Sequence, residues 1–78
     1  MNITVSKENY LKAILFLKQK NGHVRATDVA ASLSVKKPSV SIAFGKLAAD
    51  GLILVHSNHE VDLTEAGYSI AAKISHSY

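Results

Sequence analysis

Apolar positions in the first two thirds of the chain recur three and four residues apart, which is the spacing of helices that bury one face. Ser6 is a suitable cap and Glu8 a suitable first-turn acid for a first helix, which Asn21-Gly22 ends. The predicted inner stripe of this helix is Tyr10, Ala13, Ile14 and Leu17, widened by Leu11 and Phe16. A short second helix is predicted over residues 27–33, with the inward positions Val29, Ala30 and Leu33.

A third helix is predicted from Lys37 to Ala49, after a tight turn at residues 34–36. Pro38 fits its first turn, where the missing backbone N–H is not needed. Asp50-Gly51 closes the helix. One apolar face runs along it at i, i+3, i+4 and i+7, made of Val40, Ala43, Phe44 and Leu47.

The period changes after Gly51, from helical spacing to the alternation typical of strands. An apolar strand is predicted over residues 52–55 and a second strand over residues 60–63, with a polar hairpin tip at residues 56–59 between them. Thr64 caps a last helix that has Glu65 in its first turn. Its predicted inner stripe is Ala66, Ile70, Ala71 and Ile74.

The predicted order is a helix, a short extended segment at residues 23–25, two helices, two strands and a final helix. This order describes a mainly α domain with a small β-hairpin, namely a winged helix-turn-helix with a three-helix core, a two- to three-stranded wing and a C-terminal helix. The 78 residues contain no repeat or linker and are predicted to be one domain, residues 1–78. Cysteine is absent, and the apolar run at residues 13–17 is too short to cross a bilayer, so a cytoplasmic protein is expected.

Positive charge is concentrated in the first two thirds of the sequence. Residues 1–49 carry eight Lys or Arg and two acids, a balance of +6, and residues 50–78 carry one Lys and four acids, a balance of −3; together they give the net charge of +3. Such an asymmetry indicates a cationic face suited to a polyanion, although a solvated lysine-rich surface gives the same count.

The second helix of a helix-turn-helix can enter the major groove of DNA, so the helix from Lys37 to Ala49 is the candidate recognition helix. Lys36 and Lys37 lie where free backbone N–H groups also attract phosphate, and Lys46 can reach a phosphate or a guanine edge. The outward serines are short donors that allow a close approach. With flanking and wing residues, the predicted DNA-binding set is Arg25, Thr27, Lys36, Lys37, Pro38, Ser39, Ser41, Ile42, Lys46, Ser57, Asn58 and His59.

Several of these residues have a second interpretation. Ile42 is apolar on a polar face and either contacts a thymine methyl or is an ordinary exposed apolar residue. Thr27 either contacts phosphate or caps its own helix, and residues 57–59 either contact DNA or form a plain polar turn. Gly45 weakens a helix by roughly 1 kcal/mol relative to alanine. It either marks a close approach to another surface or has no functional meaning.

Enzymatic chemistry is not indicated by the sequence. It contains no glycine-rich phosphate loop and no nucleophile with an evident base. The histidines have no metal-ligand spacing on one element; they are His23, His56, His59 and His76. We therefore predict no catalytic residue and no metal site.

Five segments together carry a family resemblance. They are residues 6–14 (SKENYLKAI), residues 24–30 (VRATDVA), residues 37–41 (KPSVS), Lys46-Leu47 with Asp50-Gly51-Leu52, and residues 63–67 (LTEAG). Their combination resembles the N-terminal DNA-binding domain of the iron- and manganese-dependent repressors, the family of the diphtheria toxin repressor and the manganese transport regulator. The similarity covers nearly the whole chain.

This resemblance implies a homodimer that reads a palindromic operator. It also implies control by a divalent metal, manganese or iron, bound between this domain and a following dimerisation domain. The first-helix positions that supply metal ligands in the family correspond to Asn9 and Lys12, and the latter is usually acidic in metal-responsive members. A protonated lysine does not coordinate a cation, so we predict no cofactor, and a divalent metal is implied by the resemblance alone. The chain is then either part of a longer regulator or a stand-alone winged helix without metal control.

The predicted function is that of a sequence-specific, double-stranded DNA-binding transcriptional regulator, and the resemblance implies a repressor. The alternative is a winged-helix module that docks a protein partner through exposed apolar residues such as Ile42. Affinity that falls steeply with salt distinguishes the first function from the second.

Overall fold

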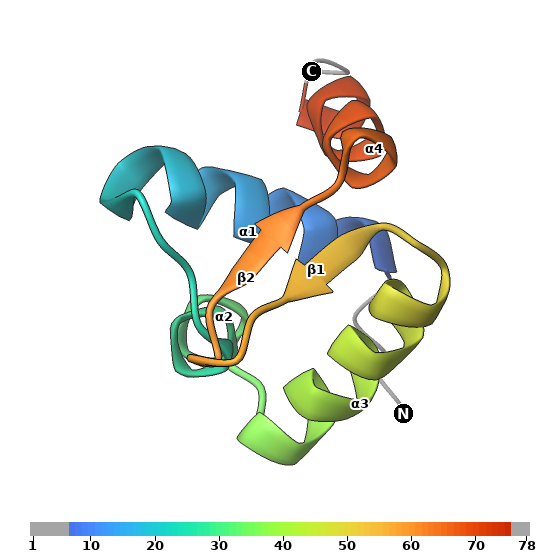
Figure 1. Ribbon diagram of the computed structural model, residues 1–78. Coiled ribbons are helices and arrows are strands. Elements are labelled where there is room, and N and C mark those ends of the chain that lie inside the picture. Colours follow the sequence, from blue (N-terminus) through green and yellow to red (C-terminus); the bar gives the residue numbers. More distant parts are fainter. Residues whose placement is uncertain (1–6, 76–78) are drawn as a thin grey trace, which may run out of the picture.

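The computed structural model describes residues 7–75, which form four helices and one antiparallel hairpin. In Figure 1, α1 crosses the molecule, with α4 above it, α2 and α3 below it, and the hairpin in front. The predicted cap Ser6 and His76 lie outside the described residues. The elements in chain order are α1 (Lys7–Asn21), α2 (Ala26–Leu33), α3 (Lys37–Ala49), β1 (Ile53–Val55), β2 (Val61–Leu63) and α4 (Glu65–Ser75).

Helix α1 lies at the centre of the hydrophobic core and contacts α2, α3, β2 and α4. Its predicted stripe is buried with one exception, because Phe16 is 58% exposed whereas Leu15 is 7% exposed. The buried arc is centred on Ile14, and each residue advances by about 100° round the helix axis. Phe16 therefore lies about 200° from Ile14, on the face that no other described element covers. The prediction that Phe16 widens the inner stripe is wrong for this reason.

Helices α2 and α3 form the helix-turn-helix. Helix α2 begins at Ala26, one residue earlier than predicted, and the Asp28 carboxylate accepts a hydrogen bond of 3.0 Å from the backbone N–H of Arg25. Arg25 is therefore the N-cap, and Thr27 lies inside the first turn instead of capping the helix. Ser34, with a φ of +56°, ends α2. Helix α3 then buries its predicted face, with Val40, Phe44 and Leu47 inside and Ala43 partly buried.

The hairpin of β1 and β2 pairs Ile53 with Leu63 and Val55 with Val61. Ile53 and Val61 point into the core, at 2% and 1% exposure. The backbone N–H of Val61 also donates a 2.8 Å hydrogen bond to the carbonyl of Val24, and residues 25 and 60 form an isolated bridge. The predicted two- to three-stranded wing is thus a two-stranded hairpin joined to the extended segment before α2. We call residues 53–63 the wing.

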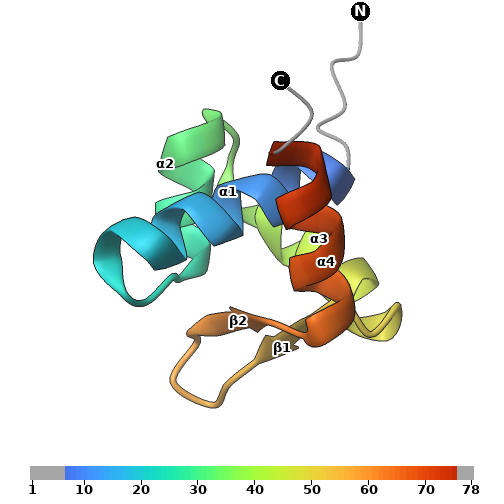
Figure 2. The ribbon, with the colours of Figure 1, turned by 90° about the horizontal axis from the view of Figure 1, so that it is seen from above.

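Helix α4 begins after Thr64, whose side chain caps it as predicted: its Oγ1 accepts a 3.1 Å hydrogen bond from the N–H of Gly67. Figure 2 shows α4 crossing the N-terminal half of α1. Ala71 is fully buried and Ile70 partly buried, whereas the side chain of Ile74 lies outside the described residues. The prediction for Ala66 is wrong, because Ala66 is exposed and Gly67 is buried. A Cβ at Gly67 would collide with the carbonyl oxygen of Leu52, so only glycine allows this close approach.

Candidate nucleic-acid interface

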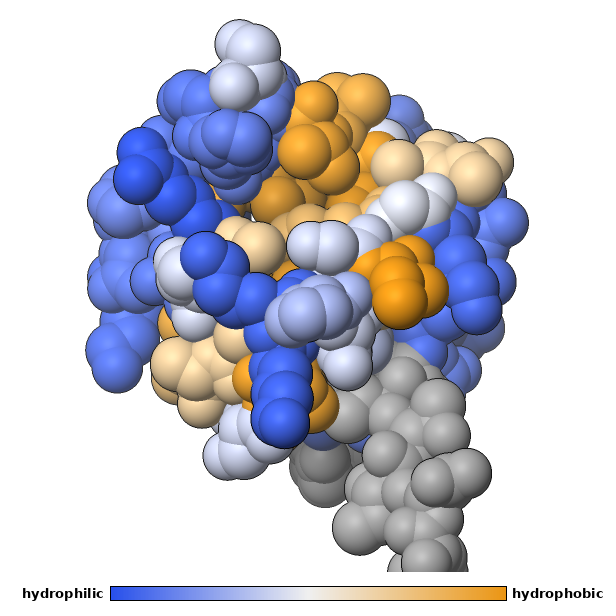
Figure 3. Space-filling view, turned by 90° about the horizontal axis from the view of Figure 1, so that it is seen from below, coloured by the Kyte–Doolittle hydropathy of each residue, from blue (hydrophilic) through white to orange (hydrophobic). Residues whose placement is uncertain are grey.

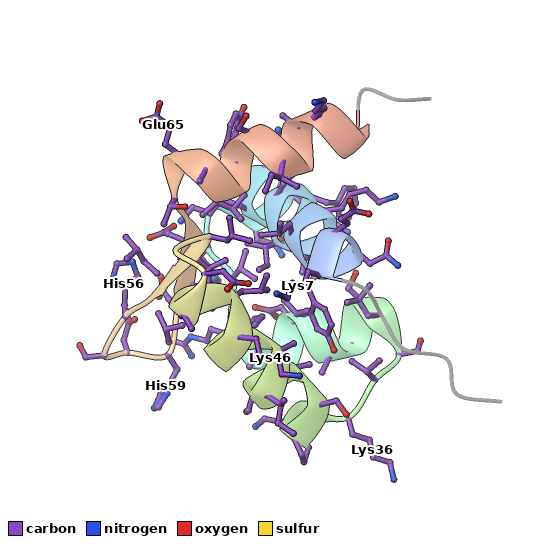
Figure 4. All side chains as sticks on the ribbon, turned by 90° about the vertical axis from the view of Figure 1, so that its right-hand side faces the viewer. Lys7, Lys36, Lys46, His56, His59 and Glu65 are labelled. Carbon is purple, nitrogen blue, oxygen red and sulfur yellow. The ribbon has the colours of Figure 1, made fainter. Side chains whose placement is uncertain are left out.

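The exposed side of α3 lies at the end of the molecule remote from α4 (Figure 1). Ile42 is 63% exposed, although it is a large apolar side chain. In Figure 4, Lys36 projects beyond the start of α3, and Glu65 lies at the opposite end of the molecule. All twelve side chains of the predicted DNA-binding set are exposed, so each of them is accessible to a ligand.

Within residues 7–75, ion pairs join lysine and arginine side chains to acids that lie far away in the sequence. The Nζ of Lys7 lies 2.5 Å from Asp50, Lys18 pairs with Asp62, and an Nη of Arg25 lies 3.9 Å from Glu60. Each pair joins a cation from the first two thirds of the sequence to an acid from the last third. Among the described residues, Asp50, Asp62 and Glu60 therefore neutralise cations on α1 and before α2, and none of these three pairs includes a lysine of α3.

The three lysines of α3 and its cap form no ion pair with any residue in the described range 7–75. They are Lys36, Lys37 and Lys46. The first turn of α3 also contains no acid, so the positive end of the helix dipole adds to the charge of the two lysines there. The asymmetry read from the sequence is thus concentrated on the candidate recognition helix, which favours the polyanion interpretation over a uniformly solvated lysine surface.

A second charged cluster ties the wing to α1, and sequence reasoning missed it. Asp62 of β2 receives a hydrogen bond from Lys18, and its Oδ2 lies 2.6 Å from the Nε2 of His56. The Lys18 ammonium, and then the His56 imidazole, hold the pKa of the Asp62 carboxyl below its usual value of 3.8. His56 is therefore engaged where the turn of the wing begins, and the two partners lie 44 and 6 residues from Asp62 in the chain.

The tip of the wing is a tight turn with specific local contacts. The side-chain Oδ1 of Asn58 accepts a 3.1 Å hydrogen bond from the N–H of Glu60, so this residue holds the turn. His59 adopts a φ of +70°, and its N–H donates a 3.0 Å hydrogen bond to the carbonyl of His56. In Figure 4 the His59 side chain projects toward the same side of the molecule as the start of α3. The tip and α3 therefore present one common side.

The residues at the family's metal-ligand positions do not fit a divalent cation. Asn9 and Lys12 line a hollow of about 720 Å³ between α1 and α2, beside Phe16. Within residues 7–75, no group of three or more His, Cys, Asp or Glu side chains is close enough together to hold a metal ion. A lysine ammonium repels a cation, and the neutral amide of Asn9 supplies a single weak ligand.

A helix-turn-helix followed by a hairpin, with unpaired lysines on its second helix, defines a winged-helix DNA-binding domain. The sequence profile of the iron-dependent repressor N-terminal DNA-binding domain matches residues 2–61. The chain belongs to this family. The predicted fold class and the family resemblance are thereby confirmed, and the members of this family are transcriptional regulators, not enzymes.

Solved structures of regulators superimpose on most of the chain. The manganese regulator SloR shares 30% identity at a TM-score of 0.80, over 94% of this chain and 34% of SloR. A MarR-family regulator from Neisseria meningitidis shares 27% identity at a TM-score of 0.70, over 87% of this chain and 52% of its own. The MepR–DNA complex of S. aureus has the same fold, at 24% identity and a TM-score of 0.69, over 94% of this chain and 55% of MepR.

The chain spans about a third of the length of SloR. No curated protein matches it at a significant level. No helix among residues 7–75 is long and apolar enough to cross a membrane.

Proposed function

We propose that this chain is the DNA-binding domain of a transcriptional repressor. It binds a specific sequence of double-stranded DNA, with α3 in the major groove. The observation that carries the proposal is the charge distribution. Acids of the last third of the chain pair with cations elsewhere, whereas Lys36, Lys37 and Lys46 have no ionic partner in the described part of the chain. Unpaired lysines on an exposed helix suit the DNA backbone, which carries a negative charge about every 1.7 Å of duplex axis.

The outward residues of α3 divide into two roles. Lys36, Lys37 and Lys46 bind phosphates and give affinity for any sequence, whereas Ser39 and Ile42 face the base edges. Ser39 donates to an acceptor in the major groove, and Ile42 covers a thymine methyl. An isoleucine that is 63% exposed gains from such burial.

The flanking residues extend the contact along the duplex. Ser57, Asn58 and His59 lie at the tip of the wing, where they reach the adjacent minor groove or its phosphates. Arg25 and Thr27 lie at the start of α2 and meet the phosphate backbone beside α3. Glu60 lies 3.9 Å from Arg25 and weakens the attraction of this residue for phosphate.

We further propose that two copies act together as a homodimer. One recognition helix covers a short half-site, and a second linked copy raises the affinity through its effective concentration. Phe16 and Tyr68 are 58% and 52% exposed and offer apolar surface for such an assembly. Sedimentation equilibrium tests this: the dimer predicts a mass that doubles with rising concentration, and a constant monomer mass contradicts it.

Selection of bound sequences from random duplex DNA tests the central proposal. We expect one enriched motif, with two half-sites about one helical turn apart if the dimer forms. Lys37→Ala should weaken binding to all sequences alike, whereas Ile42→Ala should change the preferred base at one position. Recovery of no enriched motif from a folded protein contradicts sequence-specific binding.

A second candidate function, docking of a protein partner, is favoured by the hollow between α1 and α2 and by the exposed Phe16 on its rim. Binding through this apolar surface predicts an affinity that changes little with salt and falls in Phe16→Ala. DNA binding predicts an affinity that falls steeply with salt and does not change in Phe16→Ala.

A further inference from the structure

A hollow of about 320 Å³ lies between α3 and the wing. Figure 3 shows this side of the molecule, where hydrophobic residues lie between hydrophilic ones. One wall belongs to α3 and consists of Ser41, Phe44, Gly45 and Ala48; the other belongs to the wing and consists of Val55 and His59, and Ala26 of α2 also lines the hollow. We call it the α3–wing groove.

Gly45 has no side chain to fill the groove on the α3 side, and the packing of the protein does not require a glycine there. A Cβ built on Gly45 meets no atom within 4 Å, and its φ is not in the left-handed region. Glycine inside a helix lowers stability relative to alanine. The other helical glycine differs, because Gly67 packs directly on the carbonyl of Leu52. The open space in front of Gly45 is therefore suited to an occupant from outside the chain.

The opposite wall carries His59 in an unusual backbone conformation. Its φ of +70° is uncommon for a residue with a side chain, although histidine adopts it more often than most. His59 lines the groove from the wing, and Ser41 lines it from α3. Both groups can donate a hydrogen bond to a phosphate oxygen. Val55 also lines the groove and is 51% exposed, so its apolar side chain suits the C–H surface of a deoxyribose.

We propose that the α3–wing groove seats the sugar–phosphate backbone of one DNA strand, with its closest approach at Gly45 and hydrogen bonds from Ser41 and His59. The inference rests on the proposed function. The major and minor grooves of a duplex are separated by a single backbone. If α3 occupies the major groove and the wing the next minor groove, that backbone has to pass between them. Lys37 and Lys46 stand on the same helix and add attraction for its phosphates.

Variants of Gly45 test the groove separately from the fold. Gly45→Ala should raise the melting temperature by about 4 °C, because alanine is the better helix former, and should nevertheless lower the affinity for DNA. Gly45→Leu should lower affinity by about tenfold or more, since the larger side chain overpacks the seat of the strand. Ala66→Leu on α4 is the matched control for added bulk at an exposed helix position, and should stay within about twofold of the parent.

Affinity is measured by fluorescence anisotropy on the duplex recovered by selection, and folding by circular dichroism. His59→Ala is measured alone and combined with Gly45→Leu. If both walls hold the same strand, the two losses are smaller together than their sum, because the first substitution already displaces the backbone. Additive losses contradict a shared seat. If Gly45→Leu does not fold, the comparison of Gly45→Ala with the parent decides.

The possible failures are distinguishable. A parent chain that binds no duplex overturns both the proposed function and the groove. A parent chain that binds DNA, with Gly45→Leu folded and equally tight, overturns the groove alone. If Gly45→Ala is more stable than the parent and binds DNA more weakly, the result supports the proposed groove, because a loss of folded structure cannot explain weaker binding by a more stable protein.

Discussion

Replacing each lysine of α3 and its cap by alanine perturbs the interface without disturbing the core. Lys36, Lys37 and Lys46 are exposed and form no ion pair within residues 7–75, so their removal leaves no buried charge or broken bridge behind. Each lysine that neutralises a phosphate contributes about 0.9 to the slope of log K against log salt. Each single variant should therefore show a slope shallower by about 0.9.

The size of the effect follows from counterion release. Three lysine–phosphate contacts give a slope of about −2.7, so a fourfold rise in salt lowers affinity by about 40-fold. A single Lys→Ala variant has a slope of about −1.8 and loses about 12-fold over the same range. Further contacts from Arg25 or the wing would steepen all slopes together. The difference between parent and variant, a factor of about 3.5, stays the same.

The assay is an anisotropy titration of one labelled duplex at several salt concentrations. Lys20→Ala is the matched control, because Lys20 is an exposed lysine at the end of α1, where its Nζ lies 5.9 Å from the Phe16 ring. Its slope should equal that of the parent. If all three α3 variants keep the parental slope while Lys20→Ala becomes shallower, the interface lies on another face and the reasoning from the ion pairs is refuted.

Other predictions follow from single contacts. Gly67→Ala should lower the unfolding free energy by more than about 2 kcal/mol, since its Cβ collides with the Leu52 carbonyl; an unchanged urea midpoint would contradict this. Thr64→Ala should cost about 1 kcal/mol through the lost cap, measured in the same way. The pKa of Asp62 is lowered in the fold, so its contribution is present above pH 4 and lost as pH falls through the folded value. Acid titrations of stability should therefore be flatter below about pH 4 in Asp62→Asn, and identical curves would refute this.

The helices could be predicted from the sequence because their spacing is regular. Val40, Phe44 and Leu47 recur four and three residues apart, and the structure buries all three. The errors fall where packing partners decide which face is covered. Phe16 is apolar but lies opposite the arc of α1 that the other elements cover. On α4, Gly67 is buried in place of the predicted Ala66, because α4 packs closely against the backbone of Leu52.

The exposure of the candidate site residues could be predicted from the sequence, whereas their electrostatic environment could not. The outward lysines of α3 follow from the position of its apolar face. The partners of Lys7 and Lys18 lie 43 and 44 residues away, and no local pattern reveals such pairs. The structure therefore adds the observation that matters most for function, namely which cations are neutralised and which are left on α3.

The roles of Gly45 and Gly67 could not be predicted from the sequence either. Both interrupt helical patterns, and the sequence offers no difference between them. The structure separates them, because Gly67 is required by a backbone contact and Gly45 faces open space beside the wing. One glycine therefore belongs to the fold, and the other belongs to the proposed interface.

The measurement that tests the central claim most directly is an NMR titration of the chain with its selected duplex, followed by amide chemical shifts. Binding through α3 predicts the largest changes at residues 39–46 and at the tip of the wing, with α4 nearly unchanged. Changes confined to α1 and α2, around the hollow beside Phe16, with α3 unperturbed, would contradict the account.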